Sequence, residues 1–226
     1  LAGWVALQMD RAHHHADAAE RAKADALVAL LTPVVKAGFT DFGFESAVQA
    51  QQVFGGHGYI REWGMEQYVR DARIAQIYEG TNGVQAMDLA GRKLSLAGGA
   101  VVDGFFDMVA SELTEAGKAE GVRLIAARTG EALELLRQTT ASLKGADVDS
   151  LGAAAVDYLR MFALVSFGWI WVRMAQAAAG GETPLHAAKR DMARYFATRM
   201  LPQVQGLASQ IAAGPEPVLA LKVDMF

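Results

Sequence analysis

Glu79 is the residue whose neighbours in the sequence best suit acid–base chemistry. It follows the apolar Ile77 and the aromatic Tyr78 and precedes Gly80. Neighbours of this kind can partly exclude water from a carboxylate, and a carboxylate in a dry site can act as a general base. A solvated loop glutamate is the simpler interpretation of these four residues alone. The local sequence therefore makes Glu79 a candidate base without establishing it.

A glycine-rich turn precedes this segment and could contact a ligand. It contains Gly55, Gly56 and Gly58. Glycine accepts positive φ and lets a ligand approach the backbone amides, as phosphate-binding loops do. Glycines of this kind also commonly end helices. The turn alone does not decide between these two interpretations.

The histidines and the absence of cysteine argue against a metal centre. His13, His14 and His15 are consecutive, and neighbouring side chains on a helix point about 100° apart, so the three cannot all reach one ion. The chain has no cysteine, which excludes thiolate ligands and disulfides and permits a reducing compartment. We expect no metal site and a cytoplasmic protein.

The composition is that of a packed globular protein, with 52% hydrophobic and 20% charged residues among 226. The 21 Lys and Arg against 25 Asp and Glu leave a net charge of −4, and no basic run could follow a phosphate backbone. The most membrane-like run, residues 161–172, is shorter than the roughly 18–20 residues that a spanning helix needs. We expect a buried helix there, and neither nucleic acid nor a membrane as partner.

The elements that carry these residues are predicted to be almost all helical, because apolar residues recur at three- and four-residue spacing. Pro33 predicts a kink or a break, and Thr183 before Pro184 predicts a helix start. We predict an all-α fold in which an antiparallel helical bundle is followed by a second helical bundle or layer. The predicted helices cover residues 3–14, 18–54, 64–76, 84–96, 102–116, 119–143, 151–179 and 184–213.

A small-residue segment that begins at Ala97 predicts a boundary between residues 1–96 and residues 97–226. In the second part, one helical stripe of large apolar residues predicts core packing rather than a cofactor contact. Its members are Tyr158, Phe162, Val165, Trp169 and Val172.

Three blocks within residues 51–85 resemble the carboxy-terminal signature of acyl-CoA dehydrogenases. They are the turn Q-x-x-G-G-x-G-Y that starts at Gln52, the sequence R-D-A-R that starts at Arg70, and the sequence I-Y-E-G-T-N that starts at Ile77. All three are in register with that signature, and the close match covers residues 37–94.

The part after Ala97 is similar to the helical extension of one branch of this family, the 3-methylmercaptopropionyl-CoA dehydrogenase-like branch. Because this second resemblance rests on helical patterning rather than on a motif, it is the less specific of the two.

The resemblance implies a role for Glu79 and for the residue that follows it. Glu79 matches the family's catalytic base, which removes the α-proton of an acyl-CoA thioester while the β-hydrogen leaves as hydride to the flavin, giving a trans-2-enoyl-CoA. Gly80 would lie against the substrate. The implied activity is therefore that of an FAD-dependent oxidoreductase of fatty acid metabolism.

The resemblance also implies FAD contacts on two separate segments. Gln52, Gly55 and Gly56 match positions that touch the adenine-dinucleotide half of FAD bound to a neighbouring subunit. Thr81 and Gly83 match positions that touch the FAD of the subunit's own site. Many family members carry Gln or Glu at the position of Gly83, so only a backbone contact is expected there. These matches imply a homo-oligomer, a dimer or tetramer, with electron-transfer flavoprotein as electron acceptor.

The family's amino-terminal helical domain and its β-domain are absent from this sequence, which begins at Leu1 without a signal peptide. We therefore expect a fragment that is inactive alone and does not retain FAD. The alternative is a non-catalytic helical oligomerisation or interaction module derived from the same family.

Overall fold

The computed structural model describes residues 1–225, and within this range the chain forms helices and no strand. The all-α prediction is confirmed. The longer α-helices are α1 (Ala2–His14), α2 (Ala18–Val53), α4 (Met65–Ala75), α6 (Ala100–Ala116), α7 (Glu120–Leu143), α8 (Val148–Ala178), α9 (Pro184–Tyr195) and α10 (Gln203–Ala212). The shorter pieces are α3 (Gly56–Tyr59), η1 (Arg61–Trp63), α5 (Asn82–Met87), η2 (Asp88–Arg92), η3 (Lys93–Gly99), η4 (Phe196–Met200), α11 (Glu216–Leu219) and η5 (Val223–Met225).

Side chains at helix starts fix several of these bounds. The start predicted at Thr183 is confirmed, because its Oγ1 accepts a hydrogen bond from the amide of His186 at 3.4 Å and Pro184 takes the first helical position. Asp17 and Asp147 cap α2 and α8 in the same way.

The helix predicted over residues 84–96 is in fact three shorter pieces. It begins as α5, passes into the π-type turn η2 and then into the 3₁₀ segment η3. The pattern predicted over residues 184–213 is likewise divided into α9, the π-type turn η4 and α10. Pro202 directly precedes α10, and proline has no amide hydrogen with which to continue a regular helix.

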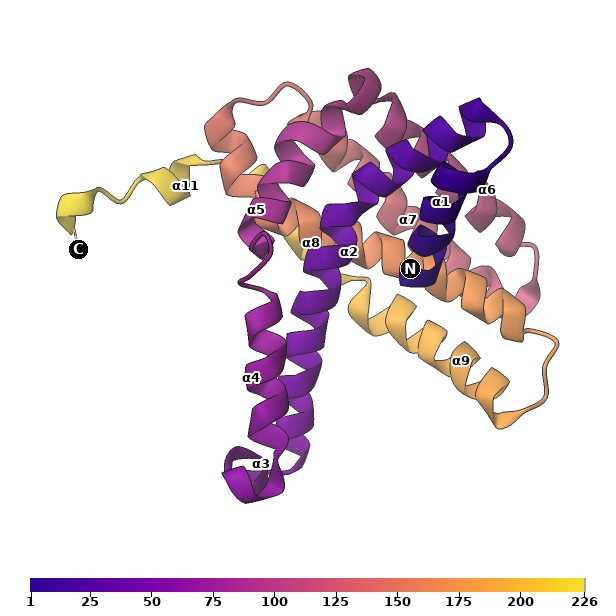
Figure 1. The fold of residues 1–226 in the computed structure, drawn as a ribbon, viewed down its shortest axis with the longest axis horizontal. Helices are drawn as coiled ribbons and strands as arrows, with labels where there is room; N and C mark the ends of the chain where they lie inside the picture. Colours follow the sequence, from indigo (N-terminus) through magenta and orange to yellow (C-terminus); the bar gives the residue numbers. More distant parts are fainter. Residues whose placement is uncertain (226) are drawn as a thin grey trace.

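Pro33 does not break α2, which runs through it as one helix of 36 residues. Figure 1 shows α2 changing direction between the body of the molecule and the part that projects from it. Such a bend relieves the clash between a proline ring and the preceding turn. The sequence thus predicted a kink or a break, and the structure has the bend without the break.

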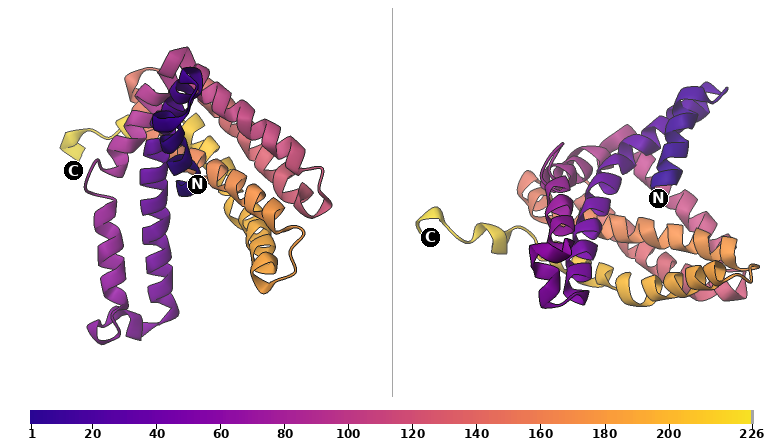
Figure 2. Two further views of the ribbon diagram at one scale, coloured as in Figure 1. Left: turned by 45° about the vertical axis from the view of Figure 1, so that its right-hand side comes forward. Right: turned by 60° about the horizontal axis from the view of Figure 1, so that its bottom comes forward.

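The second half of α2 projects from the body and is paired with α4, which runs back antiparallel to it (Figures 1 and 2). We call this pair, with α3 at its tip, the arm. No residue of α4 is buried. Half of the exposed large apolar side chains in the described residues belong to residues 39–87, which include the arm. The arm therefore leaves apolar surface in contact with solvent.

The apolar stripe of α8 forms the centre of the core, as predicted. Tyr158, Phe162, Val165, Trp169 and Val172 are each at most 1% exposed. Residues 161–172 are thus part of a buried helix, as predicted.

Residues from both sides of the predicted boundary share one hydrophobic core. Phe39 of α2 stacks on Phe167 of α8 with ring centroids 5.6 Å apart. Ala97 and the two glycines that follow it have positive φ, so the chain turns sharply at the boundary. The division into two domains, residues 1–96 and 97–226, stays a prediction. The two parts pack against each other around the same core.

Three helical runs are long and apolar enough to cross a membrane by length and composition: Ala18–Val53, Asn82–Ala116 and Val148–Ala178. The last of these has 67% of its most apolar window buried within the fold. Burial of this degree accounts for the apolar character of α8 without lipid.

Candidate active site

Glu79 lies in the loop between α4 and α5, where the arm meets the body (Figure 1). Its φ of 52° and the φ of 81° at Gly80 place two consecutive residues in the left-handed region. The side chain of Glu79 is exposed. Ile77 and Tyr78 are 47% and 52% exposed, so they do not cover the carboxylate. In this chain by itself, Glu79 is therefore a solvated loop glutamate, which is the simpler of the two interpretations of its neighbours.

One carboxylate oxygen binds both flanks of this loop. Gln76 Nε2 and Asn82 Nδ2 each donate to Asp41 Oδ1 at 2.6 Å. Lys36 Nζ donates to Asn82 Oδ1 at 2.7 Å, and Asn82 also donates to the hydroxyl of Thr40 at 2.9 Å. These five residues, all half-buried, are called the Asp41 cluster.

The R-D-A-R block contributes to this arrangement through its last residue. Arg73 Nη1 donates to Gln76 Oε1 at 2.8 Å, which orients the amide of Gln76 so that its nitrogen reaches α2. Arg70 and Asp71, which also belong to this block, are adjacent on α4 and are not paired with each other in the described part of the chain. Asp71 instead accepts from Gln67, four residues earlier, because adjacent residues on a helix do not face each other.

The three residues Gly80, Thr81 and Gly83 differ in how strongly the local structure requires their residue type. A Cβ on Gly80 would lie 2.5 Å from Gln85 Nε2, the movable end of a flexible side chain, so it is the φ of 81° that favours glycine there. Thr81 Oγ1 accepts from the amide of Val84 at 3.4 Å and caps α5. A Cβ on Gly83 would meet nothing within 4 Å, so packing does not impose glycine there.

The glycine-rich turn lies at the tip of the arm. Gly55 has a φ of 58°, and a Cβ on Gly58 would lie 2.3 Å from the carbonyl oxygen of Gln51. These two glycines are therefore required by the turn that ends α2, as the helix-end interpretation predicted. Gly56 and Gln52 are exposed, and a Cβ at Gly56 would meet nothing within 4 Å. The backbone at the tip is open to an approaching molecule.

The structure does not bring the two groups of predicted site residues together. Gln52, Gly55 and Gly56 lie at the tip of the arm, and the loop with Glu79 lies at its base (Figures 1 and 2). The 11 residues of α4 separate them, which corresponds to about 16 Å of helix. The assignment of these groups to two different FAD molecules stays a prediction.

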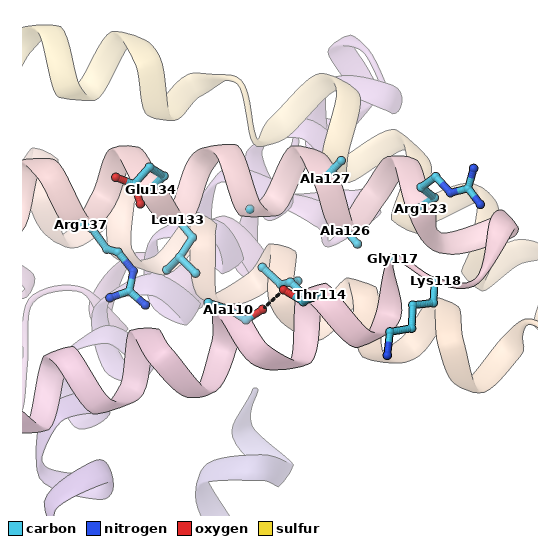
Figure 3. A pocket seen from close by; sticks show the side chains of 12 residues that line it. Ala110, Thr114, Gly117, Lys118, Arg123, Ala126, Ala127, Leu133, Glu134 and Arg137 are labelled. Atoms are coloured by element: carbon cyan, nitrogen blue, oxygen red, sulfur yellow. Dashed lines mark hydrogen bonds between the residues drawn. The ribbon is translucent and has the colours of Figure 1, made fainter.

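A groove elsewhere in the molecule contains none of these residues. It lies between α6 and α7, has a volume of about 530 Å³ and is floored by small and apolar side chains (Figure 3). Two of its cations are already paired, Arg137 with Asp107 and Lys118 with Glu115. In the part of the chain that the structure describes, no group of three or more His, Asp or Glu side chains could hold a metal ion. The loop with Glu79 remains the candidate site.

Sequence reasoning did not find Lys36, Thr40, Asp41 and Gln76 as parts of the site. Asp41 and Gln76 are 35 positions apart, and Lys36 and Asn82 are 46 apart. No local spacing links such pairs, because the pairing depends on how α4 and α5 return along α2. Asn82 was identified only as the last residue of a matching block.

Comparisons with known proteins agree with the all-helical fold and with the three blocks. The family described as "Acyl-CoA dehydrogenase, C-terminal domain" matches residues 5–94, and the family "Acetyl-CoA dehydrogenase C-terminal like" matches residues 105–222. The chain therefore belongs to the acyl-CoA dehydrogenase family.

Among its relatives is the 3-methylmercaptopropionyl-CoA dehydrogenase of Ruegeria pomeroyi, which is 34% identical over 224 residues covering 92% of this chain and 36% of the relative. The broad-specificity linear acyl-CoA dehydrogenase FadE5 of Mycobacterium tuberculosis is 28% identical over 215 residues, covering 87% of this chain and 35% of that protein. A butyryl-CoA dehydrogenase of Syntrophomonas wolfei is 38% identical over 90 residues, covering 40% and 15% respectively. The chain spans about a third of the length of the first two relatives.

Proposed function

We propose that this chain is the carboxy-terminal helical part of an FAD-dependent acyl-CoA dehydrogenase with Glu79 as general base. The carboxylate of Glu79 accepts the α-proton of an acyl-CoA thioester, and the β-hydrogen leaves with its electron pair as hydride, so that a trans-2-enoyl-CoA forms. The observation that supports this most is the loop itself. The backbone of Glu79 is in the left-handed region, and its carboxylate is accessible. Gln76 and Asn82, on either side of the loop, both donate hydrogen bonds to Asp41 on α2.

The residues that would contact FAD are compatible with that cofactor. When bound, FAD supplies the hydride acceptor. At the arm tip, Gly55 and Gly56 leave the backbone open to a large ligand, and Gln52 is exposed beside them. At the base, Thr81 is the N-cap of α5 and Gly83 lies in its first turn with open space around it. Gly80, next to the base, would contact the thioester.

The proposal extends to the oligomer and the electron acceptor by the same resemblance, and to the location and the excluded partners by the composition and the charge pattern. It includes a homo-oligomer with FAD at the subunit interface, electron-transfer flavoprotein as the electron acceptor, and a cytoplasmic protein without nucleic acid or membrane partners. Because Glu79 is exposed in this chain, the dry site that a thioester α-proton transfer needs has to be completed by other protein. The chain alone is therefore expected to be inactive and not to retain FAD.

One observation favours the alternative, a helical oligomerisation or interaction module. The arm exposes large apolar side chains, among them Val53 at 85% and Tyr59 at 80%, and contiguous apolar surface is typical of protein interfaces. A module that only binds another protein would not need a carboxylate at position 79. A substitution of Glu79 therefore distinguishes the two proposals, because only the catalytic one needs this carboxylate.

The test uses the full-length protein that contains this chain. Its flavin absorbance is recorded, and bleaching is followed after addition of a panel of short acyl-CoA thioesters, with Glu79→Gln measured in parallel. We expect a thioester to bleach the wild-type flavin, and Glu79→Gln to keep its flavin and not to react. A protein without flavin, or Glu79→Gln reacting at the wild-type rate, would overturn the catalytic assignment in favour of the interaction module.

A further inference from the structure

We infer that Asp41 is a positioning residue for Glu79, acting through the two side chains that flank the Glu79 loop. This inference rests on the proposed function, because it assigns Asp41 a role in the same proton transfer. Asp41 itself touches Gln76 and Asn82 and not Glu79.

The backbone of the loop needs to be held. A non-glycine residue with positive φ is strained relative to ordinary conformations, and such strain persists only where the surroundings fix it. Glu79 has a φ of 52° and is followed by Gly80 at 81°. The exposed side chains of the loop do not supply packing that would maintain this conformation. Order must therefore come from hydrogen bonds, of which one reaches the loop itself, from Gln85 Nε2 to the carbonyl of Gly80 at 3.5 Å, and the others lie toward its ends.

Asp41 supplies these bonds at both ends at once. Gln76 lies three residues before Glu79 and Asn82 three residues after it, and their amides meet at the same Oδ1, each at 2.6 Å. A backbone hydrogen bond of 3.1 Å from the amide of Asn82 to the carbonyl of Gln76 closes the loop between them. One carboxylate oxygen thus holds together the two ends of the loop that carries Glu79.

The charge of the cluster favours this arrangement. A carboxylate accepts hydrogen bonds more strongly than a neutral oxygen does. Lys36, also on α2, donates from Nζ to Asn82 Oδ1 at 2.7 Å, and the amide nitrogen of Asn82 donates to Asp41. Arg73 does the same for Gln76 through its Oε1 at 2.8 Å. Both amides are therefore oriented by a cation on one side and by Asp41 on the other.

The experiment compares four forms of the full-length flavoprotein: wild type, Asp41→Ala, Asp41→Asn and the control Asp25→Ala. Asp25 lies on the same helix α2 and is exposed. For each form we would measure flavin content, melting temperature, kcat and KM with a reactive thioester, the kinetic isotope effect with the α-deuterated thioester, and amide hydrogen exchange in residues 77–82.

We expect Asp41→Ala to keep its flavin and to lower kcat by about 10- to 100-fold, because a displacement of about 1 Å at the reacting group can cost this much. KM should change by less than about threefold, the isotope effect should rise as α-proton removal becomes slower, and exchange in residues 77–82 should accelerate. Asp41→Asn keeps an acceptor oxygen and the same shape, and should fall between Asp41→Ala and wild type. Asp25→Ala should match wild type in every measurement.

The inference is overturned if Asp41→Ala, or Asp41→Asn should Asp41→Ala not fold, keeps the wild-type kcat and isotope effect. It is also overturned if kcat falls only in proportion to lost flavin or lost folded protein, since Asp41 would then have a structural role alone. Glu79→Gln separates this result from the proposed function. If that variant is inactive while Asp41→Ala is normal, only the positioning role fails, and if Glu79→Gln is fully active the proposed function fails as well.

Discussion

Gly80 and Gly83 both follow Glu79 in the sequence, yet their backbone conformations differ. Gly80 has a φ of 81° and has Gln85 Nε2 within 2.5 Å of an added Cβ, whereas Gly83 is in the first turn of α5 with open space around it. Glycine is therefore needed for conformation at one position and not at the other.

We expect Gly80→Ala to lower the free energy of unfolding of the chain by about 1–2 kcal/mol, the usual cost of a left-handed alanine. Gly83→Ala is the matched control, and it should be neutral or stabilising by up to about 1 kcal/mol, because alanine favours helix. Urea unfolding followed by circular dichroism measures both. Equal losses for the two variants would show that the left-handed conformation at Gly80 is not what matters.

Tyr158 is the residue whose ionisation should make stability depend on pH. Its hydroxyl lies 2.7 Å from Thr140 Oγ1 within the core, and burial raises the pKa of Tyr158 well above its usual value near 10. A raised folded-state pKa means that the contribution is present below about pH 10 and is lost above it, since only the unfolded chain then releases the proton.

Above about pH 10 the free energy of unfolding should fall by up to about 1.4 kcal/mol per pH unit because of Tyr158. The other four tyrosines, Tyr59, Tyr68, Tyr78 and Tyr195, are exposed. Urea titrations at pH 8, 10 and 11 test it, with Tyr158→Phe as the comparison. A slope that survives in Tyr158→Phe would assign the alkaline loss to another group.

Among the helices, the arm contacts α8 through Phe39 and Phe42, which pack on Phe167, and through an ion pair made by Arg160. Arg160 binds both carboxylate oxygens of Glu45 on α2 and lies 5.1 Å above the ring centroid of Phe42. The side chains of Arg160 and Glu45 are 28% and 45% exposed, so solvent weakens the pair. The ion pair joins the projecting half of α2 to the central helix of the core.

We expect Arg160→Ala to lower the free energy of unfolding by about 1 kcal/mol, after allowing for that solvent screening. Arg160→Lys should recover only part of this, because an ammonium group does not reproduce a two-point contact with a carboxylate. Arg128→Ala is the control. It breaks an exposed pair with Glu131 within a single helix and should change stability by less than about 0.5 kcal/mol. An equal effect of Arg128→Ala and Arg160→Ala would contradict the special role of the ion pair.

At the scale of the whole molecule, the arm is where further protein is expected to bind. It projects from the body (Figure 2), α4 buries none of its residues, and Tyr68 and Ile74 on it are 66% and 53% exposed. In the proposed homo-oligomer, such a surface would be covered by a second copy, because burial of apolar area drives association.

The double variant Tyr68→Glu and Ile74→Glu should therefore reduce the full-length protein to a smaller species in sedimentation velocity, without loss of helical circular dichroism. Leu124→Glu on α7, which changes a residue that is 48% exposed away from the arm, should leave the oligomer as it is. An unchanged sedimentation coefficient for the double variant would place the subunit contact elsewhere.

Features that depend on neighbours along the chain could be predicted from the amino-acid sequence. Periodicity predicted the helices and the stripe of α8 from Tyr158 to Val172, since a helix brings residues three and four apart onto one face. Thr183 with Pro184 predicted a helix start, and three short blocks predicted the family. In each case the signal is local, so it can be read without knowing the fold.

Which distant residues meet could not be predicted in this way, because it depends on how the helices pack. The exposure of Glu79 and the convergence of Gln76 and Asn82 on Asp41 depend on α4 and α5 returning along α2, and no spacing in the sequence encodes that return. Hydrogen bonds between residues more than 30 positions apart are set by how helices pack against one another, and helix packing is a property of the folded chain.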